Sequence, residues 1–212
     1  MKSKNIYLCS PKEYNGTISL PMIEFTRLKK SIDLSDVDTI LFTSKQAIIY
    51  TNEISNDWQS KKILAVGSAT AKIAKELGAK NIYHPKEFYG EVLANDILTK
   101  FSSNKIVYIR PKVVSFDSKS FLSNEGIDIK EEILYETTCK KHTNKELEDG
   151  AVVIFTSPST IECFFKSFNW DSSYKAVVIG KSTLRNLPKN VTAFVSEEAT
   201  IDSCVKKAQE IV

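Results

Sequence analysis

Pairs of hydroxyl side chains occur where short apolar runs of this 212-residue chain end. Each run is typical of a buried strand, and each pair opens a segment with helical periodicity. A helix N-terminus offers unpaired backbone N–H groups and partial positive charge, so with nearby hydroxyls it can bind a carboxylate. The same residues can instead be ordinary helix caps. They are Thr43, Ser44, Ser68, Thr70, Thr156, Ser157, Ser182 and Thr183.

The hydroxyl-bearing turns belong to an internal repeat. Phe42-Thr43-Ser44 recurs as Phe155-Thr156-Ser157, 113 residues later, and the stretch 65–70 is echoed at the same interval by 178–183. Two motifs kept at one interval predict a duplicated unit in which both turns lie at one edge of a parallel sheet. This repetition favours anion binding over capping alone.

Strands and helices are expected to alternate around these turns, which predicts an α/β fold of two similar domains, each a parallel sheet flanked by helices. Apolar residues at Ile161, Phe164 and Phe168, for example, define one face of a helix that begins near Pro158. The expected strands are 5–9, 39–42, 62–66, 81–83, 105–109, 151–155, 176–179 and 191–195.

The N-terminal strand is expected to complete the sheet of the second unit, which otherwise lacks a strand. The stretch 6–12, IYLCSPK, resembles 107–112, VYIRPK. This predicts a discontinuous first domain, 1–24 plus 138–212, and a second domain, 25–137, inserted into it. The chain then crosses between the domains twice, and the two antiparallel crossing strands form a linker beside a cleft.

The second crossing segment, 129–139, alternates between apolar and polar residues, as a long exposed strand does. Simple alternation places Ile133 and Tyr135 on one face of this strand. Leu134 is the one apolar residue on the opposite face.

The composition indicates a cytoplasmic globular protein that binds neither nucleic acid nor membrane. The net charge is only +3, and no dense basic patch is present. No apolar run approaches the ~20 residues of a membrane span, and the first residues lack the apolar core of a signal peptide. The four cysteines, Cys9, Cys139, Cys163 and Cys204, have no metal-ligand spacing and are expected to be reduced. A monomer is expected because no unexplained apolar stripe remains.

Several common catalytic motifs are missing from the chain. It contains no P-loop, no G-x-G-x-x-G, no zinc-protease motif and no G-x-S-x-G. The two histidines, His84 and His142, stand alone and are expected at the surface.

The order of five motifs resembles the uroporphyrinogen-III synthase family. The F-T-S turn and the G-x-x-T turn occur twice, and three further matches cover Leu20–Ile23, Ile133–Thr137 and Ile154–Phe165. The resemblance extends over essentially the whole chain. It implies two α/β domains joined by a two-stranded linker, as the strand pattern indicates independently.

The resemblance also implies a reaction. The substrate would be hydroxymethylbilane, a linear tetrapyrrole octacarboxylate, which loses water and closes to uroporphyrinogen III with ring D inverted. No metal or organic cofactor is implied, and porphobilinogen deaminase is a candidate partner. Such an enzyme acts mainly by positioning the two ends of the linear substrate, and it binds the substrate carboxylates through helix N-termini and hydroxyls.

The family motifs assign roles to residues of this chain. Tyr135 matches the tyrosine expected to be the general acid for the departing hydroxyl, although it can also be a half-buried strand residue. The eight hydroxyl residues above carry over as substrate-binding candidates, together with Lys181 and Arg110. The arginine expected after the first strand is absent, because Cys9-Ser10-Pro11 stands there, and Arg110 is followed by Pro111 rather than glycine.

Two other readings of the sequence stay open. The first is a non-enzymatic two-domain binder of a small anionic ligand, for which a phenol at Tyr135 would have no use. The second, a nucleotide-sugar transferase, lacks the expected glycine-rich loop and metal-binding aspartate pair.

Overall fold

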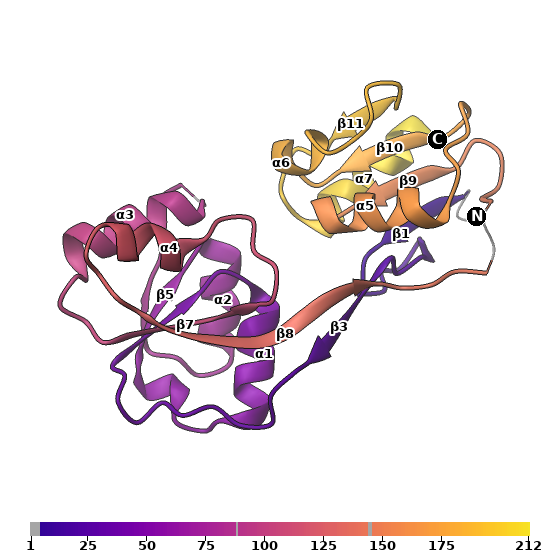
Figure 1. Ribbon diagram of the computed structural model, residues 1–212. Helices are drawn as coiled ribbons and strands as arrows, with labels where there is room; N and C mark the ends of the chain where they lie inside the picture. The colour runs from indigo at the N-terminus through magenta and orange to yellow at the C-terminus, as the bar shows by residue number, and fades with distance from the viewer. Residues whose placement is uncertain (1–4, 88, 144–145) are drawn as a thin grey trace. The chain divides into compact units, whose positions relative to one another are not determined.

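The computed structural model describes residues 5–87, 89–143 and 146–212 (Figure 1). The chain forms two compact units, which we call the split unit (Met1–Glu24 with Thr138–Val212) and the inserted unit (Phe25–Thr137). Each is a mainly parallel sheet flanked by helices, so the α/β fold class predicted from the sequence is confirmed. No helix among the described residues is long and apolar enough to cross a membrane.

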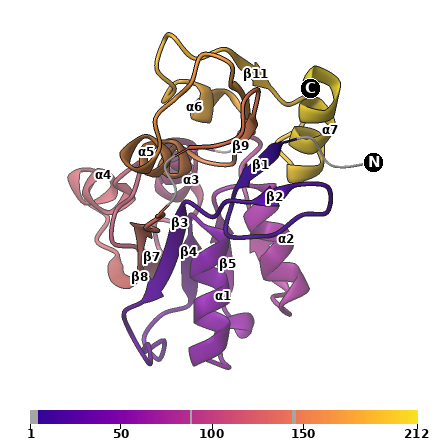
Figure 2. The same ribbon diagram turned by 90° about the vertical axis from the view of Figure 1, so that its right-hand side faces the viewer.

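The inserted unit is built on a six-stranded sheet in the order β3-β8-β7-β4-β5-β6. Helices α1 and α2 cover one face of this sheet, and α3 and α4 cover the other (Figures 1 and 2). The strands are β3 (Ile23–Arg27), β4 (Thr39–Phe42), β5 (Lys62–Ala65), β6 (Asn81–Tyr83), β7 (Ile106–Pro111) and β8 (Lys130–Cys139). The helices are α1 (Lys45–Ile54), the 3₁₀ turn η1 (Trp58–Ser60), α2 (Ser68–Glu76), α3 (Gly90–Lys100) and α4 (Ser118–Asn124).

The central strand β4 shows why this sheet is covered on both faces. All four of its residues are buried. Ile40 and Phe42 pack in the core beneath α1 and α2, whereas Leu41 packs in the core beneath α3 and α4. A continuous apolar run is what a strand buried on both faces requires.

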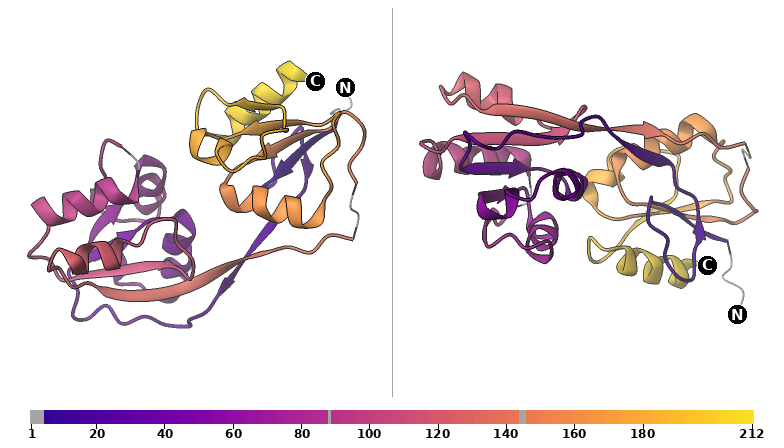
Figure 3. Two further views of the ribbon diagram at one scale, coloured as in Figure 1. Left: turned by 45° about the horizontal axis from the view of Figure 1, so that its top comes forward. Right: turned by 90° about the horizontal axis from the view of Figure 1, so that it is seen from below.

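The split unit repeats the arrangement with the strand order β11-β10-β9-β1-β2, all parallel. Helix α7, yellow in Figure 3, lies on one face and α5, orange, on the other. The elements are β1 (Ile6–Cys9), β2 (Ile18–Ser19), β9 (Val152–Phe155), α5 (Pro158–Ser167), β10 (Lys175–Val178), α6 (Lys181–Leu184), β11 (Ala193–Val195) and α7 (Ile201–Ile211). Because Leu8 of β1 is aligned with Ile154 of β9, the prediction that the N-terminal strand completes this sheet is confirmed.

Equivalent backbone hydrogen bonds confirm the repeat. Val66 N–H donates to the Phe42 carbonyl at 3.0 Å, and Ile179 N–H donates to the Phe155 carbonyl at 3.1 Å. In each unit the two strands that precede the turns are parallel neighbours. Both predicted turns of a unit therefore lie at the carboxyl edge of its sheet.

The chain passes between the units within two neighbouring strands, β3 and β8. Leu28 N–H donates to the Leu134 carbonyl at 2.8 Å, and Lys140 N–H donates to the Met22 carbonyl at 2.9 Å. Residue numbers rise along one strand as they fall along the other, so the two strands are antiparallel, as predicted for the linker.

A β-bulge corrects the predicted alternation along β8. Arg110 of β7 is opposite Ile133, but the next residue, Pro111, is opposite Tyr135, so Leu134 is the extra residue. A bulge re-aims the side chain that follows it. Leu134 and Tyr135 consequently pack in the same core beneath α1 and α2, rather than on opposite faces.

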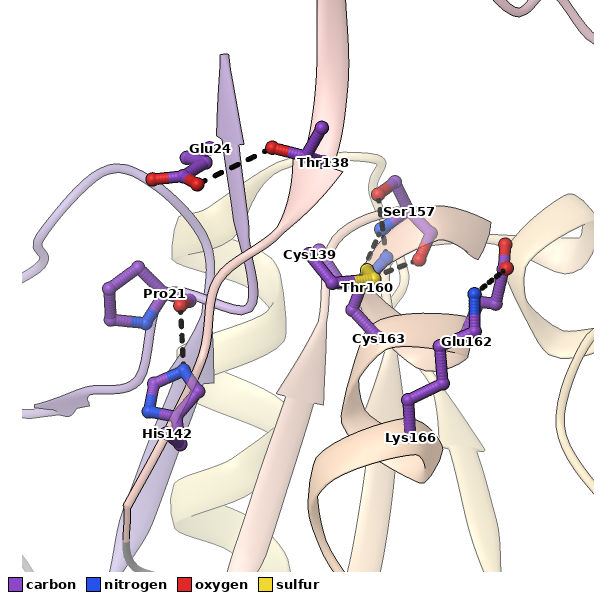
Figure 4. The surroundings of a disulfide bond; sticks show 10 residues. All are labelled: Pro21, Glu24, Thr138, Cys139, His142, Ser157, Thr160, Glu162, Cys163 and Lys166. Carbon is purple, nitrogen blue, oxygen red and sulfur yellow. Dashed lines mark hydrogen bonds and ion pairs between the residues drawn. A yellow bond between two sulfur atoms is a disulfide. The ribbon is translucent and has the colours of Figure 1, made fainter. Parts of the chain in front are cut away.

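The expectation of four reduced cysteines is wrong. Cys139, at the end of β8, forms a disulfide with Cys163 of α5, as Figure 4 shows, whereas Cys9 and Cys204 are free and buried. Their separation of 24 residues in the sequence gave no sign that the two cysteines meet.

Candidate functional site

The F-T-S turn of the inserted unit carries two contacts between a hydroxyl and a phenol. Ser44 is the N-cap of α1, and its oxygen accepts a hydrogen bond from Ala47 N–H at 3.1 Å. The Ser44 hydroxyl also lies 2.7 Å from the phenol oxygen of Tyr135, and the Thr43 hydroxyl lies 3.0 Å from that of Tyr108. The two phenols come from opposite faces of the sheet and meet the turn at its carboxyl edge.

Tyr135 is enclosed by aromatic rings. The rings of Phe25 and Tyr50 meet it edge-on at centroid distances of 5.8 and 5.7 Å, and the Tyr50 hydroxyl donates to the Phe25 carbonyl at 3.1 Å. Only 3% of Tyr135 is exposed. Burial raises the pKa of its phenol from 10.0 to about 12, and the hydrogen bond with Ser44 opposes that rise.

The second turn of the inserted unit leaves a helix start without a side-chain cap. Gly67 is the N-cap of α2, and a glycine has no side chain that could accept from the first N–H groups. Ser68 is exposed and Thr70 is buried. Ser68 is the first residue of α2 but does not cap it.

In the split unit, the F-T-S turn is a helix cap of the ordinary kind. Ser157 and Thr160 form a capping box, in which the Ser157 oxygen accepts from Thr160 N–H and the Thr160 hydroxyl accepts from Ser157 N–H (Figure 4). Thr156 donates to the backbone carbonyl of Cys9 at 3.2 Å. Both hydroxyls thus have partners inside the unit.

The fourth turn opens a helix of only four residues, α6, with Gly180 at its N-cap. Lys181 and Ser182 are exposed, and Thr183 is 1% exposed. The structure brings these residues to the same sheet edge as Thr156 and Ser157, because β9 and β10 are parallel neighbours.

Arg110 is already engaged within the inserted unit. Its Nε donates to Glu131 at 2.6 Å, and its Nη1 donates to the carbonyls of Pro111 and Lys112 at 2.8 and 3.0 Å. The hydrogen bond that Arg110 donates to the Glu131 carboxylate raises the pKa of the Arg110 guanidinium. Arg110 therefore fixes the segment that follows β7, and would have to exchange these partners to bind a ligand carboxylate.

Three residues of this site were missed from the sequence: Tyr50, Tyr108 and Glu131. One signal was present for Tyr108, because a phenol within a fully buried strand needs a hydrogen-bond partner. Tyr50 and Glu131 gave no such signal, since each fits a helix or strand surface equally well.

The two histidines differ in exposure. His84 is exposed, as expected, whereas His142 is half-buried, packs on Phe168 and hydrogen-bonds through Nε2 to the Pro21 carbonyl at 3.0 Å. Among the described residues, no group of three or more His, Cys, Asp or Glu side chains is arranged to hold a metal.

These features define a class: a duplicated two-domain α/β protein with hydroxyl-bearing turns at the carboxyl edges of both sheets. Residues 16–206 match the family model described as uroporphyrinogen-III synthase HemD. The chain belongs to the uroporphyrinogen-III synthase HemD family.

The chain is also similar to individual proteins. It is 28% identical, over 242 aligned positions, to "Porphyrin biosynthesis protein HemD" of Ruminiclostridium josui, covering 97% of this chain and 48% of the relative. The chain thus spans about half the length of the curated relative that it matches.

Two solved structures have the same fold. Uroporphyrinogen-III synthetase from Helicobacter pylori superposes with a TM-score of 0.80 at 20% identity, covering 98% of this chain and 99% of that one. A mutant uroporphyrinogen III synthase from Thermus thermophilus gives 0.64 at 11% identity, covering 97% and 96%.

Proposed function

We propose that this chain is a lyase, a uroporphyrinogen-III synthase that converts hydroxymethylbilane to uroporphyrinogen III with loss of water and inversion of ring D. The family match over 16–206 carries this proposal. The site chemistry supports it, because a buried phenol and a set of hydroxyl-bearing turns suit a dehydrating cyclisation of a polycarboxylate.

Catalysis would come mainly from positioning. Once water has left, the terminal azafulvene cation is strongly electrophilic, and the pyrrole at the other end is a good nucleophile. Unassisted closure gives the uninverted isomer I. The protein must therefore hold the two ends of the substrate so that the azafulvene is attacked by the substituted carbon of the terminal pyrrole. This attack gives a spiro-pyrrolenine intermediate.

Tyr135 is the proposed general acid. Its phenol lies at the carboxyl edge of the sheet, where it contacts Ser44. A phenol with a pKa of about 12 remains protonated at neutral pH and so has a proton to give to the departing hydroxyl. For this step the hydroxyl must become accessible from the edge on which Ser44 lies.

The substrate carboxylates would be bound by the turns at the sheet edges. Of these, the start of α2 at Gly67 is the strongest candidate, because no side chain caps its N–H groups and the helix has nine residues, whereas the equally uncapped α6 has only four. The proposed binding residues are Thr43, Ser44, Ser68, Thr70, Arg110, Thr156, Ser157, Lys181, Ser182 and Thr183.

The remaining predictions from the sequence also stay proposals. They are a monomer and porphobilinogen deaminase as a partner. The cytoplasmic location was argued partly from four reduced cysteines, and the disulfide removes that part of its support.

The test is the isomer formed from purified hydroxymethylbilane. With the protein present, we expect uroporphyrin III after oxidation, separated from uroporphyrin I by chromatography. Folded protein that leaves only isomer I would overturn the enzymatic proposal. Calorimetric binding of the substrate in that case would instead support a two-domain anion binder.

A further inference from the structure

The Ser44 hydroxyl connects the N-terminus of α1 to the phenol of Tyr135. Its oxygen accepts from Ala47 N–H and lies within hydrogen-bond distance of the phenol oxygen. The equivalent Ser157 caps α5 in the same way, and among the described residues no phenol contacts it. The phenol contact is therefore not a requirement of capping.

The direction of this hydrogen bond decides what Tyr135 can do. A hydroxyl has one hydrogen and two lone pairs. If Tyr135 donates to Ser44, its proton is already used. If Ser44 donates to Tyr135, the phenol keeps its own hydrogen for another acceptor. Ala47 N–H occupies one lone pair of Ser44 and leaves the Ser44 hydrogen available for the phenol oxygen.

The bulge at Leu134 turns the Tyr135 side chain toward Ser44. Without the extra residue, Tyr135 would lie on the face that Ile133 occupies, away from the core beneath α1. The rings of Phe25 and Tyr50 then hold the phenol in place. Strand irregularity, aromatic packing and helix capping all bring the Tyr135 oxygen to Ser44.

We propose that Ser44 is a positioning residue: it donates a hydrogen bond to the Tyr135 oxygen, so that the phenol keeps its proton for the departing hydroxyl of the substrate. This rests on the proposed function. The phenol O–H bond breaks as the C–O bond of the substrate breaks, and the hydroxyl leaves as water. Ser44 stabilises the phenolate until the proton released by the cyclised pyrrole restores it, so overall only water is lost.

A series of variants separates donation from capping. Ser44→Thr keeps both roles, Ser44→Asp keeps the cap but can only accept a hydrogen bond, and Ser44→Ala loses both. We expect kcat within about threefold of wild type for Ser44→Thr, and about tenfold lower for Ser44→Asp. Thr200→Ala, which removes the cap of α7, is the control for loss of a cap alone.

A double-mutant cycle tests whether Ser44 acts through Tyr135. In the Tyr135→Phe background, Ser44→Asp should cost no further rate, because the phenol oxygen is already gone. An equal loss in both backgrounds would show that Ser44 acts on the substrate directly and would overturn the proposal. A rise in KM with unchanged kcat would overturn it too.

NMR spectroscopy tests the hydrogen bond between Ser44 and Tyr135 independently of catalysis. In protein labelled with ¹³C at the phenol carbon of tyrosine, the NMR signal missing from Tyr135→Phe belongs to Tyr135. This signal should move in Ser44→Asp and Ser44→Ala but stay in place in Ser44→Thr and Thr200→Ala. An unmoved signal in Ser44→Asp would refute the hydrogen bond. If wild type makes no isomer III, the proposed function fails, whereas the signal still reports on Ser44.

Discussion

At the scale of single residues, burial and hydrogen bonding act in opposite directions on Tyr135. Burial favours the neutral phenol and raises its pKa, whereas the Ser44 hydrogen bond favours the phenolate. Burial is the larger effect. The phenol therefore stays protonated over the whole range in which an enzyme of this kind is assayed, and its loss of a proton must be coupled to bond breaking in the substrate.

The raised pKa of Tyr135 predicts that the pH profile of kcat/KM is flat on its alkaline side. Since a pKa of about 12 lies above the ordinary value of 10.0, deprotonation of Tyr135 should not lower kcat/KM below pH ~10. Initial rates measured from pH 6 to 9.5 with purified hydroxymethylbilane check this. A decline with a midpoint near pH 8 or 9 that disappears in Tyr135→Phe would contradict the assigned environment.

Arg110 provides a second prediction at this scale. It donates to one carboxylate and two carbonyls, an arrangement that the flexible ammonium of lysine cannot reproduce. The side chains of Arg110 and Glu131 are only 13% and 20% exposed. Arg110→Lys should therefore lower the free energy of unfolding by roughly 1–3 kcal/mol, measured by urea denaturation. Unchanged stability would show that the segment after β7 is held by other contacts.

At the scale of elements, the sequence predicted strands and helices well wherever the pattern is local. The run 39–42, the turn at Thr43-Ser44 and the helix from Lys45 follow from apolar periodicity and capping alone. The bulge in β8 could not be predicted this way, because it depends on pairing with β7. Pro111 was a hint, since a proline within a sheet is often found at a bulge.

The disulfide could not be predicted for a related reason. Its two cysteines come from β8 and α5, and only the folded split unit brings them together. A pairing between distant parts of a chain leaves no local pattern. The contact of Ser44 with Tyr135 is similar: each residue was singled out from its own motif, but nothing in the sequence showed that they meet.

The disulfide predicts a thiol count. Denatured protein prepared without reductant should show two free thiols, Cys9 and Cys204, with a colorimetric thiol reagent, and four after reduction. Four thiols before reduction would show that the bond does not form.

The same bond predicts a change in stability. Reduction, or the double substitution Cys139→Ser/Cys163→Ser, should lower the free energy of unfolding by about 2–4 kcal/mol, because the unfolded chain regains the freedom of a 24-residue loop. Urea denaturation checks this. Reductant should have no further effect on the double variant; if it did, the loss would have another origin.

At the scale of the whole molecule, the duplication explains how a chain without a recognisable catalytic motif can still contain a site. Each unit has its own cores, and the cores of the inserted unit lie entirely within Phe25–Thr137. Each unit presents two turns at one sheet edge. The two copies have diverged: within the described residues, both hydroxyls of the F-T-S turn contact phenols in the inserted unit alone.

This independence predicts that residues 25–137 fold alone. The isolated fragment should unfold cooperatively in urea and should be insensitive to reductant, since all four cysteines lie outside it. Circular dichroism and fluorescence with coincident transitions would check this. A fragment without a cooperative transition would mean that the inserted unit needs the rest of the chain.

The rate of isomer III formation by three proteins tests the central claim most directly. Wild type, Tyr135→Phe and Tyr50→Phe are compared at saturating hydroxymethylbilane, Tyr50 being the neighbouring phenol whose hydroxyl donates to the Phe25 carbonyl. We predict isomer III from wild type, a rate close to it for Tyr50→Phe, and a loss of about 10²-fold for Tyr135→Phe. Only isomer I from folded wild type, or equal rates for wild type and Tyr135→Phe, would contradict the account.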